Sequence, residues 1–147
     1  MKDARDITFL GIADAQEAVR HLLRVRFAEC LEKEHALGSG DDEAIHAFRL
    51  ACKRLRYAVE RSPADGIDFK LVAKVLANIT EELGAAHDCV VLAKRALDCN
   101  AALVARRALQ DRGRYVRRAS RMWHDAFESG GAFETLASFT GFRWSPQ

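Results

Sequence analysis

The segment Ala44–Glu60, with the sequence AIHAFRLACKRLRYAVE, carries two different patterns on what we predict to be one helix. At about 100° per residue, its large apolar side chains fall on the side that a core would bury. These are Ile45, Phe48, Cys52, Leu55 and Val59. A neighbouring stripe of the same helix holds His46, Arg49, Lys53 and Arg56. The stripe repeats positive charge roughly every 5 Å along the axis, so a linear polyanion lying there could meet several cations in succession.

The composition predicts one domain that spans residues 1–147. Hydrophobic residues make up 49% of the chain, enough for one continuous core. Because 23 Lys and Arg face 21 Asp and Glu, the net charge is only +2, and the distribution of charge must indicate the partner. The four cysteines lack CxxC spacing, the N-terminus lacks a signal-like pattern, and no apolar run approaches the roughly 20 residues that span a bilayer. We expect a cytoplasmic protein that does not enter a membrane.

The residue pattern predicts an all-α fold. Ala, Leu, Arg and Glu dominate, proline occurs only at positions 63 and 146, and no long stretch alternates apolar and polar residues. We expect an antiparallel bundle of about four long helices with a short helix at the C-terminal end. The helices would cover residues 14–37, 42–61, 68–83, 87–97 and 100–128, followed by a short piece over 133–139. Asp41 or Asp42 would cap the second helix, Gly84 would break or end the third, and His87 with Asp88 would begin the fourth.

Two segments carry a family resemblance: Ile45–Glu60, IHAFRLACKRLRYAVE, and Leu83–Leu92, LGAAHDCVVL. Together, and in this order, they resemble the paired signatures of the CHAD family, the conserved histidine α-helical domains. The resemblance covers roughly residues 12–128. A full member of that family usually has two four-helix bundles, so the chain resembles one half of a CHAD domain. It departs from the usual pattern at Lys53 and at His87, where arginine is common.

The resemblance implies binding of inorganic polyphosphate, and a place at polyphosphate granules. By the same resemblance, His46 is the defining histidine and is followed by Arg49, Lys53, Arg54 and Arg56. The arginines would clamp phosphate oxygens, Lys53 would add a point charge, and His46 would donate when protonated. A homodimer would complete the two-bundle arrangement. No cofactor is expected.

Other cations are weaker candidates for the same ligand. The last long helix carries seven arginines against Asp111 between residues 106 and 121, a local charge of +6, which a solvated face explains almost as well as a ligand site. We include four of them as candidates, Arg114, Arg117, Arg118 and Arg121. Arg20 and Arg24 lie at the edge of the apolar stripe of the first helix, where they would snorkel or line a groove shared with the second helix.

Two other functions stay open at this point. A polyphosphate or triphosphate hydrolase, or an accessory subunit of one, would need carboxylates to hold Mg²⁺, and the nearby acids, residues 41–43, are well placed as helix caps instead. A nucleic-acid or protein interaction module would use the arginine-rich last helix. The histidines show no HxxxH or HExxH spacing and no catalytic triad is evident, so we expect a non-catalytic protein without a metal site.

Overall fold

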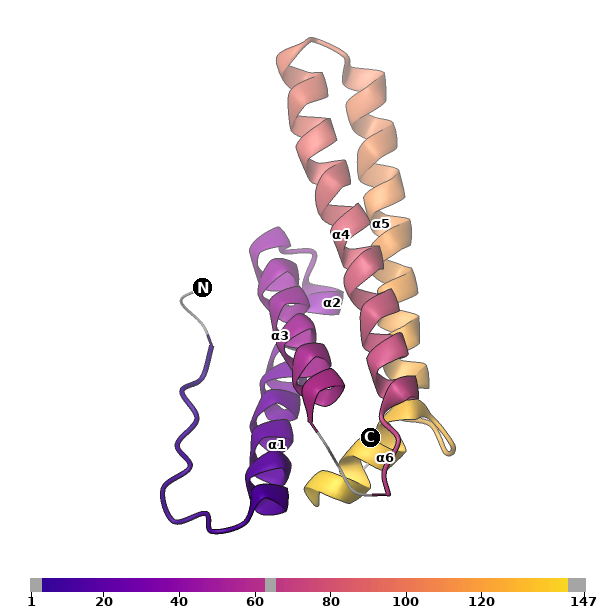
Figure 1. Cartoon of the computed structure of the whole chain (residues 1–147). Coiled ribbons are helices and arrows are strands. Elements are labelled where there is room, and N and C mark those ends of the chain that lie inside the picture. The colour runs from indigo at the N-terminus through magenta and orange to yellow at the C-terminus, as the bar shows by residue number, and fades with distance from the viewer. Residues whose placement is uncertain (1–3, 63–65, 143–147) are drawn as a thin grey trace.

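The computed structural model describes residues 4–62 and 66–142, and every regular element in these ranges is a helix. The helices are α1 (Ala15–Lys33), α2 (Ala36–Ser39), α3 (Asp42–Arg61), α4 (Lys70–Asp98), α5 (Ala102–Asp125) and α6 (Ala132–Thr140). Helices α1 and α3 pack side by side, α3 packs on α4, and α4 and α5 form a hairpin that projects well beyond the other helices (Figure 1). Helix α6 lies at the opposite end of the hairpin. The all-α prediction is confirmed.

Capping residues place the helix starts close to where the sequence puts them. The side chain of Asp14 accepts a hydrogen bond from the Gln16 backbone N–H (2.8 Å), and that of Asp41 accepts one from Glu43 (3.0 Å). The predicted end of the first helix at Leu37 is wrong, because α1 ends at Lys33. The Glu34 N–H bonds the carbonyl of Leu31, a tightened last turn, and the chain then forms the single turn α2.

The expected break at Gly84 is absent, and the two predicted helices form the single 29-residue helix α4. A glycine inside a helix costs only about 1 kcal/mol relative to alanine. Its neighbours Leu83 and Ala86 are both buried, and a break would give up their packing together with backbone hydrogen bonds. The expected N-cap at His87 and Asp88 is therefore also wrong, since both residues lie inside α4.

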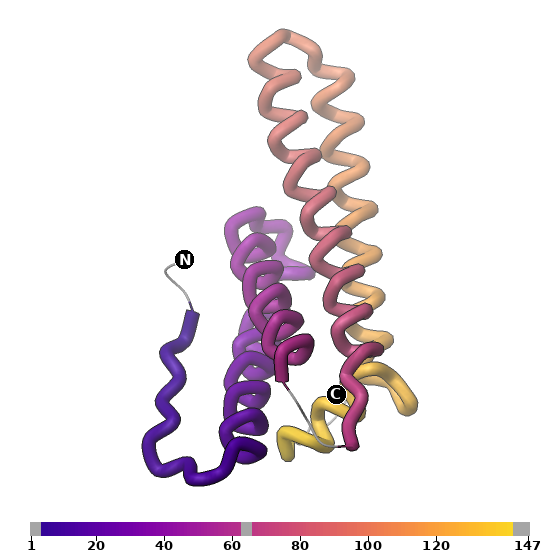
Figure 2. The backbone as a smooth tube through the Cα atoms, viewed as in Figure 1, coloured from indigo at the N-terminus to yellow at the C-terminus, as the bar shows by residue number. Residues whose placement is uncertain are grey.

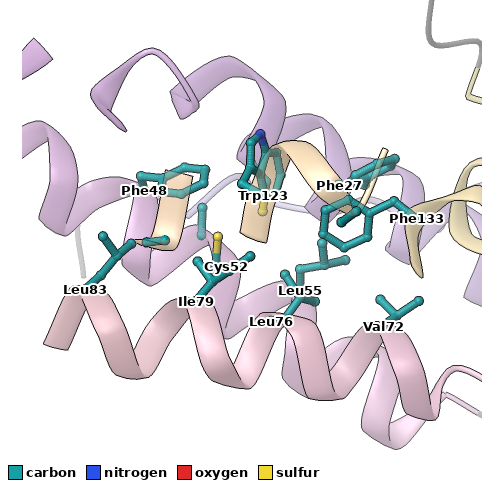
Figure 3. Close-up of a cluster of buried hydrophobic side chains, with 14 of the residues drawn as sticks. Phe27, Phe48, Cys52, Leu55, Val72, Leu76, Ile79, Leu83, Trp123 and Phe133 are labelled. Carbon is teal, nitrogen blue, oxygen red and sulfur yellow. The ribbon is translucent and has the colours of Figure 1, made fainter. Parts of the chain in front are cut away.

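The core forms where α3 faces α4, and α1, α5 and α6 close it (Figure 3). The predicted apolar face of α3 is confirmed, with all five of its side chains buried. Trp123 of α5 stands at the centre of an aromatic cluster, with ring centroids 5.1 Å from both Phe48 and Phe133. Its indole Nε1–H donates to Glu34 Oε2 at 2.8 Å, which satisfies the one polar atom of a fully buried side chain.

The hairpin projects beyond the other helices (Figure 2). Its two helices share a small second core of their own. It consists of Ala93 and Ala96 from α4 and Ala105 and Ala108 from α5. Leu109 lies on the same side of α5 as Val116 and Trp123, yet its side chain is 51% exposed while those two are buried. The reason is position: Leu109 lies in the projecting part of the hairpin, beyond the start of α3. No helix in the described part of the chain is long and apolar enough to cross a membrane.

Candidate anion-binding site

The α3 stripe, His46, Arg49, Lys53 and Arg56, lies beside the line along which α3 packs on α4. His46 is exposed, and the three cations are partly buried. Within residues 4–62 and 66–142, Lys53 makes no ion pair, and no carboxylate pairs with Arg49. Arg56 stacks its guanidinium 4.7 Å from the centroid of the Tyr57 ring, and its Nε lies 3.6 Å from a carboxylate oxygen of Glu60. The stripe therefore keeps most of its positive charge.

Arg49 is held by two residues of α4. Its Nε–H donates to the backbone carbonyl of Thr80 at 3.0 Å. Its guanidinium lies directly over Gly84, where an added Cβ would come within 3.3 Å of Nη2. The absence of a side chain at Gly84 thus gives the guanidinium its place against the helix. Arg49 is oriented by an uncharged acceptor, so its charge remains available to a ligand.

Two histidines face each other next to Arg49. The ring centroids of His46 on α3 and His87 on α4 are 5.9 Å apart, and both side chains are exposed. They border a small hollow where α3, α4 and α5 meet, with room for about one water molecule at about 10 Å³. The structure thus places the ring of His87 opposite that of His46.

Arg112 of α5 closes one side of this hollow and anchors the start of α3. It lines the hollow together with Asp42, His46, Arg49 and His87, and it was not among the binding residues predicted from the sequence. Its Nε donates to Asp42 Oδ1 at 2.7 Å, and its Nη2 also donates to that oxygen. The same Nη2 donates to the carbonyl of Gly40 at 2.9 Å. The pair spans seventy residues of sequence, so only the packing of α5 on α3 reveals it.

Arg54 lies apart from the stripe, in a buried charge cluster between α1 and α3. Its Nε is 3.5 Å from Oε2 of Glu29, whose side chain is 1% exposed. Glu29 also accepts hydrogen bonds from Arg26 at 2.9 Å and from the backbone N–H of Arg5 at 2.6 Å. Burial raises the pKa of Glu29, but the hydrogen bonds from Arg5 and Arg26 and the charges of Arg26 and Arg54 outweigh it, so the pKa is lowered.

The cations outside α3 are not brought to the stripe. Arg20 donates from Nε to the carbonyl of Phe139 at 3.1 Å and stacks on that ring, so it joins α1 to α6 rather than lining a groove with α3. Arg24 is exposed and makes no ion pair or hydrogen bond within the described part of the chain.

The four α5 candidates form a separate surface. Arg114 pairs with Asp111 at 3.1 Å, and Arg118 lies 3.7 Å from Glu82 of α4. Glu82 lies two residues after Thr80, whose carbonyl holds Arg49. Two residues correspond to about 200° around α4. The arginines of α5 therefore lie across α4 from the α3 stripe. Arg117 and Arg121 are exposed, and neither has a carboxylate partner among residues 4–62 and 66–142.

The described residues contain no group of three or more His, Cys, Asp or Glu side chains that could hold a metal ion. The four cysteines are free, with Cys30 and Cys52 buried in the core. The chemistry that the site offers is thus a row of nitrogen donors along one helix, with Asp42 and Glu60 as the acids near its two ends.

The family model of the CHAD domain matches residues 4–97 of the chain, well over half of its length. The match begins before the range expected from the motifs and ends inside α4, so α1, α3 and both motif segments lie within it and α5 lies outside. No curated protein and no solved structure matches the chain.

Proposed function

Because the chain belongs to the CHAD family, we propose that it binds inorganic polyphosphate along the α3 stripe, without catalysing a reaction of it. The proposal rests on the position in which the structure holds the guanidinium of Arg49. The Thr80 carbonyl and Gly84 hold this guanidinium in place, and no carboxylate within the described residues neutralises it. Such a cation is preorganised for an anion, because little side-chain freedom remains to be lost on binding.

The stripe suits a linear ligand better than a single phosphate. From His46 to Arg56 it spans ten residues, or about 15 Å of helix. A polyphosphate chain along it would meet Arg49, Lys53 and Arg56 in turn, with Arg49 able to bond two oxygens and Lys53 acting as a point charge. His46 and His87 would donate to the end of the chain that reaches the hollow, when they are protonated.

We assign Arg54 a structural role, because it belongs to the buried cluster around Glu29. The α5 arginines lie across α4 from the stripe and would not contact the same stretch of polyphosphate. We also expect the bound protein to collect at polyphosphate granules, since each granule presents many copies of the ligand.

A calorimetric titration with long-chain polyphosphate tests the proposal. We expect binding that weakens steeply as salt rises, because cations of the protein displace counterions from the polyanion. Arg49→Ala should weaken binding about tenfold, or about 1.4 kcal/mol. Arg24→Ala is the matched control, since it removes an exposed arginine outside the stripe and should change binding by less than about two-fold. Salt-insensitive binding, or equal losses in the two variants, would contradict the proposal.

The exposed arginines of α5 support a second candidate, the binding of nucleic acid. Arg117 and Arg121 lack carboxylate partners within the described residues, and the match to the family model ends before α5. Phosphates of single-stranded RNA would be attracted to this face. A competition experiment separates the candidates. If RNA displaces polyphosphate, and Arg121→Ala weakens both equally, the two ligands share α5 and the α3 stripe is not the site.

A further inference from the structure

The two helices of the projecting hairpin each carry a stripe that is buried inside the bundle and exposed beyond it. On α4 the stripe repeats every seven residues, at Leu76, Leu83, Val90 and Leu97. On α5 it repeats in the same way, at Trp123, Val116, Leu109 and Ala102. Exposure along α4 rises from 0% at Leu76 to 58% at Leu97, and along α5 from 0% at Trp123 to 51% at Leu109. A seven-residue repeat is the pattern of a helix that packs along its whole length.

Two contacts show where along the hairpin α3 stops covering α4 and α5. His87 of α4 faces His46, and Arg112 of α5 pairs with Asp42, so both helices pass the start of α3 at this level. Beyond this level the hairpin projects past α3 (Figures 1 and 2). From the helix bounds, this part comprises about eleven residues of each helix, or about 16 Å. On its uncovered face an open hollow of about 490 Å³ is lined by Leu97, Ala102, Ala105, Arg106, Leu109 and Gln110.

We propose that this hairpin face, formed by Val90, Leu97, Ala102 and Leu109, packs against the same face of a second copy of the chain. Two helical hairpins related by a twofold axis form a four-helix bundle, the arrangement that buries such stripes. The exposed Leu97 and Leu109 border the hollow together with the small side chains of Ala102 and Ala105, and a leucine of the partner would fill it. The inference does not depend on polyphosphate binding.

Charge favours the antiparallel arrangement. Near the tip of the hairpin the exposed Lys94, Arg95 and Arg106 outnumber the exposed Asp98. At the base of the hairpin, the start of α3 exposes the acids Asp41 and Glu43, whereas Asp42 is paired with Arg112 of the same chain. A twofold axis across the middle of the hairpin brings the cationic tip of one copy to the acidic base of the other, whereas a parallel arrangement would bring like charges together.

The size of the face indicates the protein concentration at which the dimer should form. A strip about 16 Å long and two helices wide is smaller than the roughly 800 Å² per partner of a standard interface. We therefore expect a dissociation constant in the micromolar range, with dimer dominant at about 100 μM.

Sedimentation equilibrium of the full chain between about 1 and 200 μM tests the proposal. We expect the wild type to pass from monomer to dimer over this range, and Leu97→Glu combined with Leu109→Glu to raise the dissociation constant at least tenfold. Both residues are exposed in the monomer, so helix content by circular dichroism should not change. Leu103→Glu is the control: Leu103 is 82% exposed, but it lies six residues before Leu109, about 240° around α5.

Two results would overturn the proposal. One is a wild type that stays monomeric at 200 μM, which would show that a second copy does not cover this face. The other is a double variant that dimerises as well as Leu103→Glu, which would place the contact elsewhere on the chain.

Discussion

Replacing Gly84 with alanine should separate the stability of the protein from its affinity for polyphosphate. An added Cβ would lie 3.3 Å from Nη2 of Arg49, 3.5 Å from Nε and 3.7 Å from Cζ. The first distance is shorter than the roughly 3.5–4.0 Å at which such atoms pack, so the guanidinium must move by a few tenths of an ångström. The hydrogen bond from Nε to Thr80 resists the movement, because Thr80 lies on the same helix as the new methyl group.

Two opposing effects set the magnitude. Alanine in a helix interior is favoured over glycine by about 1 kcal/mol. A hydrogen bond from a charged group contributes about 1.5–3 kcal/mol, and losing part of it cancels most of that gain. We expect a melting temperature within about 2 °C of the wild type. The displaced guanidinium should bind polyphosphate three- to tenfold more weakly, or about 0.7–1.4 kcal/mol.

Gly113→Ala on α5 is the matched control. The added Cβ would lie 3.2 Å from Nη1 of Arg117, but that arginine is exposed and free to move. This variant should show the full helix gain, a melting temperature about 3 °C higher, and unchanged binding. Thermal unfolding followed by circular dichroism and a polyphosphate titration measure the two effects. If Gly84→Ala gained as much stability as Gly113→Ala and bound polyphosphate like the wild type, the proposed seat of Arg49 would be refuted.

Three further predictions concern the cluster around Glu29. Glu29→Gln should lower the free energy of unfolding by about 3 kcal/mol, because it leaves Arg26 and Arg54 without a charged partner, whereas Glu32→Gln at an exposed pair should cost less than about 1 kcal/mol; urea denaturation measures both. The pKa of Glu29 is lowered, so its stabilising effect should be complete above pH 4.5, the ordinary value, and disappear as the pH falls through the lowered pKa; a difference between wild type and Glu29→Gln that stayed constant down to pH 2 would contradict this. Arg54→Ala should destabilise the protein yet leave polyphosphate affinity within about two-fold, the reverse of Arg49→Ala, and a tenfold loss of affinity would return Arg54 to the binding site.

The sequence predicts the two faces of α3 well, because both follow from the period of a single helix. It does not predict the unbroken α4, since the local cost of Gly84 is outweighed by the burial of Leu83 and Ala86, which depends on other helices. For the same reason, the sequence does not distinguish the cations that belong to the stripe from those held elsewhere in the fold. Arg54 is drawn to Glu29, a residue of another helix, and the separation of α5 from the stripe depends on the rotation of α4 about its axis.

The local pattern nevertheless contained one signal. A glycine inside an otherwise helical segment often has a packing reason. Here that reason is the side chain of Arg49, and Gly84 belongs to the second family motif while Arg49 belongs to the first. The two motifs are thus two sides of one contact.

Helix α4 runs without a break from the bundle to the tip of the hairpin. One continuous helix carries both the Thr80 carbonyl that orients Arg49 and, nearly five turns on, the exposed Leu97 of the hairpin. If a partner on the hairpin face tilted α4 as one rod, the position of Arg49 relative to α3 would shift. The two proposed binding events would then be linked, and each would change the affinity of the other by the same factor.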